Sequence, residues 1–562
     1  MRMIERFLRQ APLGWVFMAL MHSAMADLPA ESSVRGPERL SPPRFAPESR
    51  SRVPHSDATT PAAALLSVRA QVFLKALDLV GSTVFTWADI EPIVRPYLNR
   101  SVSAEELQQI RLALTQQYVD KGYINSGVII PDQEVIDGTV RMQVIEGRLS
   151  ELQVTGIRRL RADYIKDRLW LGAGKPLNIN ALQERILLLH EDPLIERINA
   201  ELSPGLLPGE AVLKADTTES SPYRVRLGFD NRRPPSVGEY MGTLHLETLN
   251  LTGLGDGLYG EVSEGRGPAD YRLGYSVPLT AQNTRLSLRY DLGHSMVFGA
   301  PYQYLDIESK SRNVALALTH PLVKTTIQEL ALGLSLESRR CRGWLLGDPY
   351  GFCGDPEKGH SLVNVARFSQ DWTYRTVQQV VAARSTLSAG VGAFGATVHA
   401  DWPDSQFLAW LGQFQWARRV FNDHEWLFRA SAQWANDRLL PQEQFAVGGL
   451  DTVRGYLQNQ LVRDTGWIAS LEYRLPLLRH HPAGDLQMAG FIDGGGAVNR
   501  HDQEDSGKDV LVSAGLGLLY QWNQRISAQL YWGHRLRQVS TGENSHGLQD
   551  KGVAFSLNIN LF

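Results

Sequence analysis

The chain has 562 residues, too many for one ordinary core, so several domains are expected. The formal net charge is −3, with 21% charged and 43% hydrophobic residues. That balance gives no support to nucleic-acid binding, which would leave a clustered basic footprint. Glycine is abundant at 50 residues and 13 tryptophans are present, a composition typical of a large β-protein with aromatic girdles and also of many secreted enzymes.

The first 26 residues have the pattern of a secretory signal peptide. Arg2, Arg6 and Arg9 precede an apolar run at residues 11–21, and a small-residue cleavage site ends at Ala26. The apolar run is too short to cross a bilayer as a helix, and no later segment offers about 18 apolar residues in a row. We therefore expect an exported protein, whose only possible form in a membrane is a β-barrel.

Residues 27–64 form a proline-rich linker. Proline recurs there among serine, arginine and glutamate residues. Such a segment cannot bury enough apolar surface to order itself, so we interpret it as an extended tether.

Two α+β units of similar length follow, at residues 65–147 and 148–221. The first has the element order β-α-α-β-β, at residues 72–79, 87–98, 103–122, 127–130 and 139–145. Ser103 and Glu106 form a capping-box pattern, and Gly122 ends the helix that they begin. In the second unit Asn180 is the expected cap of the second helix. Its elements repeat the order at residues 149–154, 162–169, 181–190, 195–202 and 211–215.

Strict alternation replaces helical periodicity over residues 222–562. Apolar residues alternate with polar ones, arginines among them, around residues 223–229, 286–292, 426–434, 526–532 and 553–561. This is the pattern of a transmembrane β-barrel, although a soluble β-sandwich has the same period. Export favours the barrel, and about sixteen strand-like segments of roughly 21 residues each, loops included, agree with the even strand numbers of bacterial barrels.

Two motifs lie within the alternating region. Val453-Arg454-Gly455-Tyr456 belongs to a long polar insertion at residues 436–462, between the eleventh and twelfth strand-like segments. Phe491-Ile492-Asp493-Gly494-Gly495 lies in the thirteenth, where Asp493 points inward if Ile492 faces lipid. A planar guanidinium pairs well with a carboxylate, and a glycine after the arginine permits a close turn of the backbone.

These motifs carry a resemblance to a known superfamily. Val453-Arg454-Gly455-Tyr456 resembles the signature of the sixth extracellular loop in BamA-type outer-membrane proteins, and Phe491, Asp493 and Gly495 match the F-x-D-x-G strand motif of that superfamily. The two α+β units look like tandem POTRA domains, its periplasmic modules. Two such domains before a sixteen-stranded barrel resemble the two-partner secretion transporters of the haemolysin and filamentous-haemagglutinin exporter type, over about residues 65–562.

The resemblance implies a mechanism. The loop would fold into the barrel, where Arg454 would meet Asp493 in a structural lock rather than a catalytic pair. The protein would be a monomeric pore in the outer membrane of a Gram-negative bacterium, in contact with outer-membrane lipid and with its POTRA domains in the periplasm. It would secrete a large partner protein, such as an adhesin, a haemolysin or a contact-dependent toxin.

Two other classes of function are weighed against secretion. Factors that assemble outer-membrane proteins share the fold, but they usually carry more than two POTRA domains. A barrel enzyme such as a lipase needs a nucleophile constellation, which is not found in the sequence, so no catalytic residue and no cofactor is expected.

The chain departs from the family pattern in two places. Members usually carry an amphipathic plug helix before the linker, whereas residues 27–47 contain five prolines and no helical face. Family barrels also end with an aromatic residue in phase with the outward residues of the last strand. Here that phase runs through Leu561 and leaves Phe562 one residue out.

Three further patterns suggest possible sites. Cys341 and Cys353 lie between the seventh and eighth strands, and an oxidising compartment favours a loop-closing disulfide over two free thiols. Residues 390–395 fit G-x-G-x-x-G, but no helix is expected after them, so nucleotide binding is rejected. His480 and His481 have no third ligand at plausible spacing, so a solvated turn is favoured over a metal site.

Overall fold

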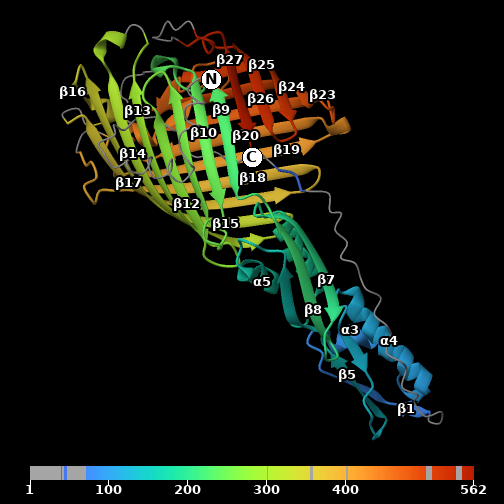
Figure 1. The fold of residues 1–562 in the computed structure, drawn as a ribbon. Helices are drawn as coiled ribbons and strands as arrows, with labels where there is room; N and C mark the ends of the chain where they lie inside the picture. Colours follow the sequence, from blue (N-terminus) through green and yellow to red (C-terminus); the bar gives the residue numbers. More distant parts are fainter. Residues whose placement is uncertain are drawn as a thin grey trace.

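A computed structural model describes residues 40, 44–46, 71–299, 302–354, 358–399, 403–500, 509–539 and 547–561. Two α+β units precede a closed β-barrel, and both extend from one end of it (Figure 1). The expected signal peptide at residues 1–26, the linker at residues 27–64 except for residues 40 and 44–46, and Phe562 lie outside the described residues. None of the described helices is long and apolar enough to span a membrane.

The first α+β unit packs two helices against a three-stranded sheet of order β2-β5-β4. Ile110, Leu114 and Tyr118 form the inner face of its long helix α4 and are fully buried. The unit consists of β1 (Val72–Leu74), β2 (Ala76–Val80), α3 (Trp87–Val94), a 3-10 turn (Arg95–Tyr97), β3 (Arg100–Val102), α4 (Ala104–Asp120), β4 (Gly127–Ile129) and β5 (Thr139–Ile145).

Two details of this unit differ from the sequence prediction. The strand expected at residues 72–79 is broken at Lys75, where the backbone N–H donates to the carbonyl of Gly138, and β1 pairs with the unpredicted strand β3. The helix expected at residues 87–98 ends at Val94 and passes into the 3-10 turn. Pro96 lies in that turn and supplies no backbone donor to continue the helix.

The capping box at α4 forms as the sequence predicts. The backbone N–H of Glu106 donates to Ser103 Oγ at 3.2 Å, and the N–H of Ser103 donates to Glu106 Oε2 at 2.8 Å. The helix ends before Gly122, whose φ of +91° is accessible to glycine at little strain.

Replacing Ser103 with alanine is expected to lower the stability of the first unit by about 1 kcal/mol, because one backbone donor of α4 loses its partner. The urea concentration that makes this unit sensitive to limited proteolysis in the full-length protein measures the change. Ser101→Ala on the neighbouring strand β3 is the matched control, since Ser101 is exposed and caps no helix. Equal urea midpoints for the two variants would contradict the prediction.

The second unit repeats the arrangement with a sheet of order β6-β8-β7, in which β6 and β8 are parallel. One prediction here is wrong, because Asn178 rather than Asn180 caps α6: Asn178 Oδ1 accepts the N–H of Asn180 at 2.9 Å. The helix begins two residues earlier than expected, and Ile179 joins the buried core. The elements are β6 (Arg148–Thr155), α5 (Ala162–Trp170), α6 (Ile179–His190), β7 (Ile195–Pro204) and β8 (Glu210–Glu219).

The C-terminal part is a closed antiparallel barrel of sixteen strands, as the alternation predicts. A two-residue strand, β16 (Asp348–Pro349), only folds back on β15. The strands are β9 (Tyr223–Asp230), β10 (Met241–Leu249), β11 (Gly257–Gly265), β12 (Asp270–Pro278), β13 (Arg285–Met296), β14 (Glu308–Lys324), β15 (Gln328–Leu345), β17 (His360–Arg375), β18 (Gln379–Val391), β19 (Leu408–Arg419), β20 (Glu425–Ala435), β23 (Thr465–Leu478), β24 (Asp485–Val498), β25 (Asp509–Trp522), β26 (Ile526–Arg535) and β27 (Val553–Asn560).

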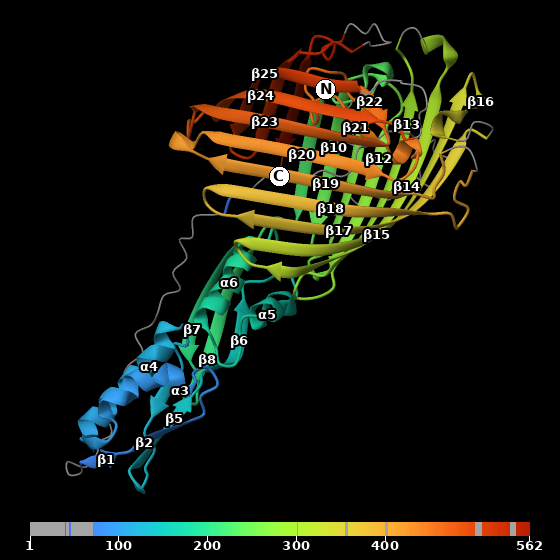
Figure 2. The same cartoon turned by 180° about the vertical axis from the view of Figure 1, so that it is seen from behind.

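Side chains alternate between the two faces of the barrel wall. On β26, Trp532 is 50% exposed on the outer face while its neighbour Tyr531 is 3% exposed on the inner face. The barrel closes where β27 pairs with β9. Connections are short at the end that carries the α+β units, the proximal end, as in residues 325–327 and 376–378. The longest connection, residues 436–464, lies at the opposite, distal end (Figure 2).

Candidate functional site

Residues 436–464, called here the inward loop, return from the distal end into the barrel. The loop connects β20 to β23, the eleventh and twelfth barrel strands, which is the position expected from the sequence. It contains a small hairpin of β21 (Phe445–Val447) and β22 (Leu461–Arg463). Between these strands lies Arg454, the largest fully buried side chain among the described residues. The loop is therefore part of the barrel interior.

Arg454 forms a bidentate ion pair with Asp493 on β24. The guanidinium donates from Nε to Oδ2 at 2.7 Å and from Nη2 to Oδ1 at 2.8 Å, and the backbone N–H of Arg454 donates to Oδ2 at 3.0 Å. Asp493 is 1% exposed and Ile492 is 50% exposed, so the two point to opposite faces of the wall. A planar guanidinium held along one edge by both oxygens of a carboxylate has a fixed orientation as well as a strong attraction.

Two further wall residues, which the sequence analysis did not identify, complete the polar contacts of Arg454. Its Nη1 forms an ion pair with Glu472 on β23, and its Nη2 donates to Ser470 Oγ at 3.1 Å. Arg474 Nε donates to the other oxygen of Glu472 at 2.6 Å. The residue pairs Ser470–Asp493 and Glu472–Phe491 are cross-strand partners, so the register of β23 against β24 places both acids beside Arg454.

Two aromatic rings lie against the guanidinium group of Arg454. The Phe491 ring centroid lies 3.7 Å from Arg454 Cζ, and that of Tyr531 lies 4.7 Å from it. The Tyr531 hydroxyl also donates toward Glu472, with oxygen distances of 3.2 and 3.3 Å. The rings exclude water from an ion pair that water would otherwise screen. We call Arg454, Ser470, Glu472, Asp493 and the two rings the Arg454 cluster.

Gly455 brings the backbone of the inward loop into contact with β26, which lies two strands along the wall from Asp493 on β24. Its φ is +90°, and a Cβ atom there would lie 2.7 Å from the carbonyl oxygen of Gly533 on β26. Arg535, two residues along the same strand, donates from Nε to the carbonyl of Gly455 at 2.6 Å. Two glycines facing each other thus permit a backbone-to-backbone approach that any side chain would prevent.

The other members of the two motifs secure the loop around this contact. Val453 is fully buried in an apolar cluster with residues of β21 and β25. The Tyr456 hydroxyl donates toward the carbonyl of Val512 at 2.9 Å and accepts the N–H of that residue at 3.2 Å. Gly495 leaves room for the hairpin, since a Cβ atom there would lie 2.8 Å from Val447 Cγ1.

A second group of charges binds the beginning of the inward loop to the other side of the barrel. Glu443 accepts two bonds from Arg367 Nη2 on β17, at 2.8 and 2.9 Å, and lies 3.3 Å from Arg339 Nη1 on β15. Glu337 pairs with the same two arginines. We call these four residues the Glu443 cluster. Its wall members, Glu337, Arg339 and Arg367, lie on strands seven and eight, whereas the wall members of the Arg454 cluster lie on strands twelve, thirteen and fifteen. The loop therefore bridges the lumen.

Cys341 and Cys353 are joined by a disulfide, with their Cα atoms 5.7 Å apart. Cys341 lies in the distal part of β15 and not between the seventh and eighth strands as expected, whereas Cys353 lies in the connection that follows β15. Both residues are buried. The adjacent Gly354 packs so closely against Leu440 that a Cβ atom at position 354 would overlap the leucine side chain. The disulfide-closed connection thus supports the first residues of the inward loop.

A double Cys341→Ser, Cys353→Ser variant is expected to be less stable by about 2–3 kcal/mol. Without the bond the unfolded chain gains the conformational entropy that a closed loop of this length withholds from it. The temperature at which the folded barrel loses its compact migration on a gel measures the effect. Dithiothreitol should lower that temperature for the parent protein to the value of the double variant, and should leave the double variant unchanged. A reductant effect of equal size on both proteins would contradict the prediction.

The remaining sequence patterns lie outside this constellation. Val391 ends β18 and residues 392–399 contain no helix, so the glycine pattern at residues 390–395 does not precede a helix N-terminus. His480 and His481 lie in the proximal turn between β23 and β24. Among the described residues no group of three or more His, Cys, Asp or Glu side chains is arranged to hold a metal ion.

One short piece of the linker contacts the barrel rim. The backbone N–H of Ala46 donates to the carbonyl of Thr376 at 3.2 Å, and the guanidinium carbon of Arg419 lies 4.0 Å from the ring centroid of Phe45. Thr376 and Arg419 belong to proximal turns and strand ends of the barrel. The linker therefore crosses this rim at residues 44–46.

A sixteen-stranded barrel with an apolar outer face, a charged lumen bridged by its own loop, and two α+β units at one mouth defines the class of outer-membrane barrels with POTRA domains. Comparison with known families makes the assignment narrower. Residues 209–520 match the haemolysin secretion/activation proteins ShlB/FhaC/HecB, and residues 72–147 match the ShlB-type POTRA domain. The chain belongs to the ShlB/FhaC/HecB family.

Individual relatives agree with this assignment. The chain is 26% identical over 442 residues to the outer membrane transporter CdiB of Escherichia coli, covering 75% of this chain and 72% of that one. It is 21% identical over 417 residues to the heme/hemopexin transporter protein HuxB of Haemophilus influenzae Rd, covering 71% of each. The solved structure of E. coli CdiB has the same fold, with a TM-score of 0.69, 22% identity, and coverage of 89% of this chain and 93% of that one.

Membership confirms the predicted class of function. The chain is an outer-membrane transporter of the two-partner secretion type, with its POTRA domains in the periplasm, and transporters of this family work with large exported proteins. The proximal end of the barrel is therefore the periplasmic end and the distal end is the extracellular one.

Proposed function

We propose that this transporter secretes one dedicated large partner protein, captured in the periplasm in an extended form. Its POTRA sheets offer edges for strand addition, and the longest is β7, a ten-residue edge strand of the second domain. The captured segment then threads the lumen and leaves at the extracellular end. Outward apolar residues support contact of the barrel with outer-membrane lipid, and the barrel that one chain closes supports a monomer.

The position of the inward loop is the main observation that supports this proposal. It occupies the lumen, and the Arg454 and Glu443 clusters attach it to opposite parts of the wall. We infer that Arg454 and Asp493 hold the loop in the position in which the lumen can conduct a polypeptide, and that they catalyse no reaction. One relative is named an outer membrane transporter and another a heme/hemopexin transporter protein. We propose that the partner here is a large exported protein of the adhesin, haemolysin or contact-dependent toxin kind.

Proteins in the culture medium of the native host test the proposal. Deleting the gene should remove one large protein from the medium, and leave the set of outer-membrane barrels unchanged. Restoring the gene in trans should restore that protein. An unchanged medium together with depleted outer-membrane barrels would instead identify a factor that assembles other barrels, which is the alternative function.

A further inference from the structure

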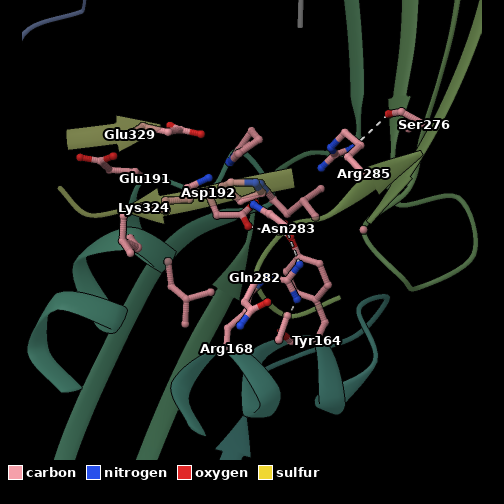
Figure 3. Close-up of a pocket in the computed structure, with 18 of the residues that line it drawn as sticks. Tyr164, Arg168, Glu191, Asp192, Ser276, Gln282, Asn283, Arg285, Lys324 and Glu329 are labelled. Atoms are coloured by element: carbon pink, nitrogen blue, oxygen red, sulfur yellow. Dashed lines mark hydrogen bonds between the residues drawn. The ribbon is translucent and has the colours of Figure 1, made fainter. Parts of the chain in front are cut away.

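A cavity of about 520 Å³ lies between the second POTRA domain and the periplasmic mouth of the barrel. Figure 3 shows its lining, with α5 and α6 on one side and the ends of barrel strands on the other. Its volume is in the range of sites that bind ligands, which is about 300–1,000 Å³. We call it the junction cavity.

The junction cavity belongs to the lumen side of the wall. Arg285 lines it, and the neighbouring side chains Leu286 and Leu288 continue the outward apolar row of β13. Leu288 is 49% exposed on the outer face, so Arg285, which lies an odd number of residues away, points inward. A polypeptide that passes from the second POTRA domain into the lumen meets this cavity, whereas membrane lipid lies on the other face of the wall.

The cavity has an excess of positive charge. Six cationic side chains and four carboxylates line it. Two of the carboxylates are paired within the cavity, Glu191 with Arg375 and Glu247 with Arg224. A third, Asp192, accepts the Tyr164 hydroxyl at 2.7 Å. Six cations against four carboxylates therefore leave an excess of two positive charges on the lining.

Arg168 and Arg285 are the most specific of these cations. Arg168 on α5 donates to Asn283 Oδ1 at 2.9 Å and to the carbonyl of Tyr164 at 2.8 Å, which uses two of its five donors. Arg285 donates to Ser276 Oγ at 3.0 Å. All these acceptors are neutral, and neither arginine has a carboxylate within 4 Å in the described part of the chain.

The two guanidinium groups also repel each other. Burial lowers the pKa of the Arg168 guanidinium from its ordinary value, and the like charge of Arg285 lowers it further, although Tyr164 and Asp192 act in the opposite direction. An anion bound in the cavity would offset this repulsion. A carboxylate fits their planar donor forks, which bind both oxygens at once.

We propose that the junction cavity is a binding site for aspartate and glutamate side chains of the exported polypeptide, held by Arg168 and Arg285 as the chain enters the lumen. This inference rests on the proposed secretion function. It adds a sequence preference, because an extended segment that carries carboxylates binds at the mouth and one that carries their amides does not. The POTRA arginine and the barrel arginine act together, so the site exists only when the second POTRA domain is docked.

A peptide-binding measurement tests the site in the full-length, detergent-solubilised protein. The probe is a blocked, fluorescent peptide of alternating serine and glutamate, and its partner has glutamine in place of each glutamate. Binding is followed by fluorescence anisotropy. The glutamate peptide should bind at least about tenfold more tightly than the glutamine peptide, which is the size expected for charge-assisted hydrogen bonds.

Three variants localise the binding. Arg168→Gln with Arg285→Gln should weaken binding of the glutamate peptide about tenfold or more. Arg285→Gln alone should weaken it severalfold, and this variant keeps the Arg168–Asn283 contact between α5 and the barrel, so undocking does not explain a loss. Lys166→Gln is the control, because it removes the same charge from α5 outside the cavity. It should bind as the parent does.

Several results would overturn the inference. Equal binding of both peptides, or equal binding by the double variant and the parent, would exclude carboxylate recognition at this site. Displacement of the peptide by short-chain phosphatidylglycerol at a comparable concentration would identify a lipid headgroup site instead. Loss of the secreted protein on gene deletion, with normal secretion by the Arg168→Gln, Arg285→Gln variant, would reject the inference and leave the proposed secretion function intact.

Discussion

Replacing Arg454 with alanine is expected to reduce secretion of the partner protein at least about tenfold while the barrel still folds and inserts. The change leaves Asp493 and Glu472 buried without the cation that joins them. Removing one member of a buried ion pair costs about 3–5 kcal/mol, which corresponds to a hundredfold or larger change in the ratio of docked to undocked loop. The barrel strands keep their own hydrogen bonds, so the defect falls on the loop.

The wall-side variants should follow a definite order. Asp493→Asn removes the bidentate partner and should approach the effect of Arg454→Ala. Glu472→Gln should be milder, because Glu472 also contacts Arg474 and the remaining Asp493 still orients Arg454. Arg454→Lys should secrete little more than Arg454→Ala, since one ammonium group cannot reach Asp493, Glu472 and Ser470 together.

Arg384→Ala provides the matched control for these variants. Arg384 forms an ion pair with Asp371 between the adjacent wall strands β18 and β17, away from the inward loop. Its loss should leave secretion near the parent level. Secretion is measured as partner protein in the medium, folding as compact migration on a gel, and loop docking as resistance to protease added outside intact cells. Normal secretion by Arg454→Ala would refute the role assigned to the loop.

Much of the fold could be predicted because local pattern determines it. The period-two alternation follows from a wall with lipid on one face and water on the other, so it identifies each strand from its own residues. Counting those strands placed Arg454 in the sixth extracellular loop and Asp493 in the thirteenth strand. The break at Lys75 is not predicted because residues 72–80 are apolar except at Lys75 and Asp78, as one continuous strand can also be, and only the long-range pairing of β1 with β3 reveals it.

The parts of the site that the sequence did not predict depend on register and on distant contacts. Glu472 is one of many inward polar residues, and it meets Arg454 only because β23 pairs with β24 in a register that includes a bulge near Pro476. Glu443 and Arg367 are 76 residues apart, and no local pattern relates them. An inward acid on a neighbouring strand, at the level of the F-x-D-x-G motif, is the signal that could have identified Glu472.

Replacing Gly455 with alanine is expected to impair secretion as severely as the loss of Arg454. A non-glycine residue at φ +90° costs about 1–2 kcal/mol from backbone strain alone. The new Cβ would also lie 2.7 Å from the carbonyl oxygen and 2.9 Å from the carbonyl carbon of Gly533, and backbone atoms of a barrel strand cannot move aside as a flexible side chain can. The loop must withdraw, and Arg454 then loses its position beside Asp493.

Gly533→Ala tests the close backbone contact between Gly455 and Gly533 without adding the backbone strain of a positive φ. Gly533 lies in β26 without a positive φ, yet a Cβ atom there would lie 2.8 Å from the Cα of Gly455. Both single variants should therefore secrete poorly and expose the loop to protease. Gly490→Ala is the control, because it lies on the same strand as Asp493 and its Cβ would meet nothing within 4 Å. Combining Gly455→Ala with Arg454→Ala should add little, because both changes release one and the same docked loop. Full secretion by Gly533→Ala would show that the lumen conducts without this backbone contact.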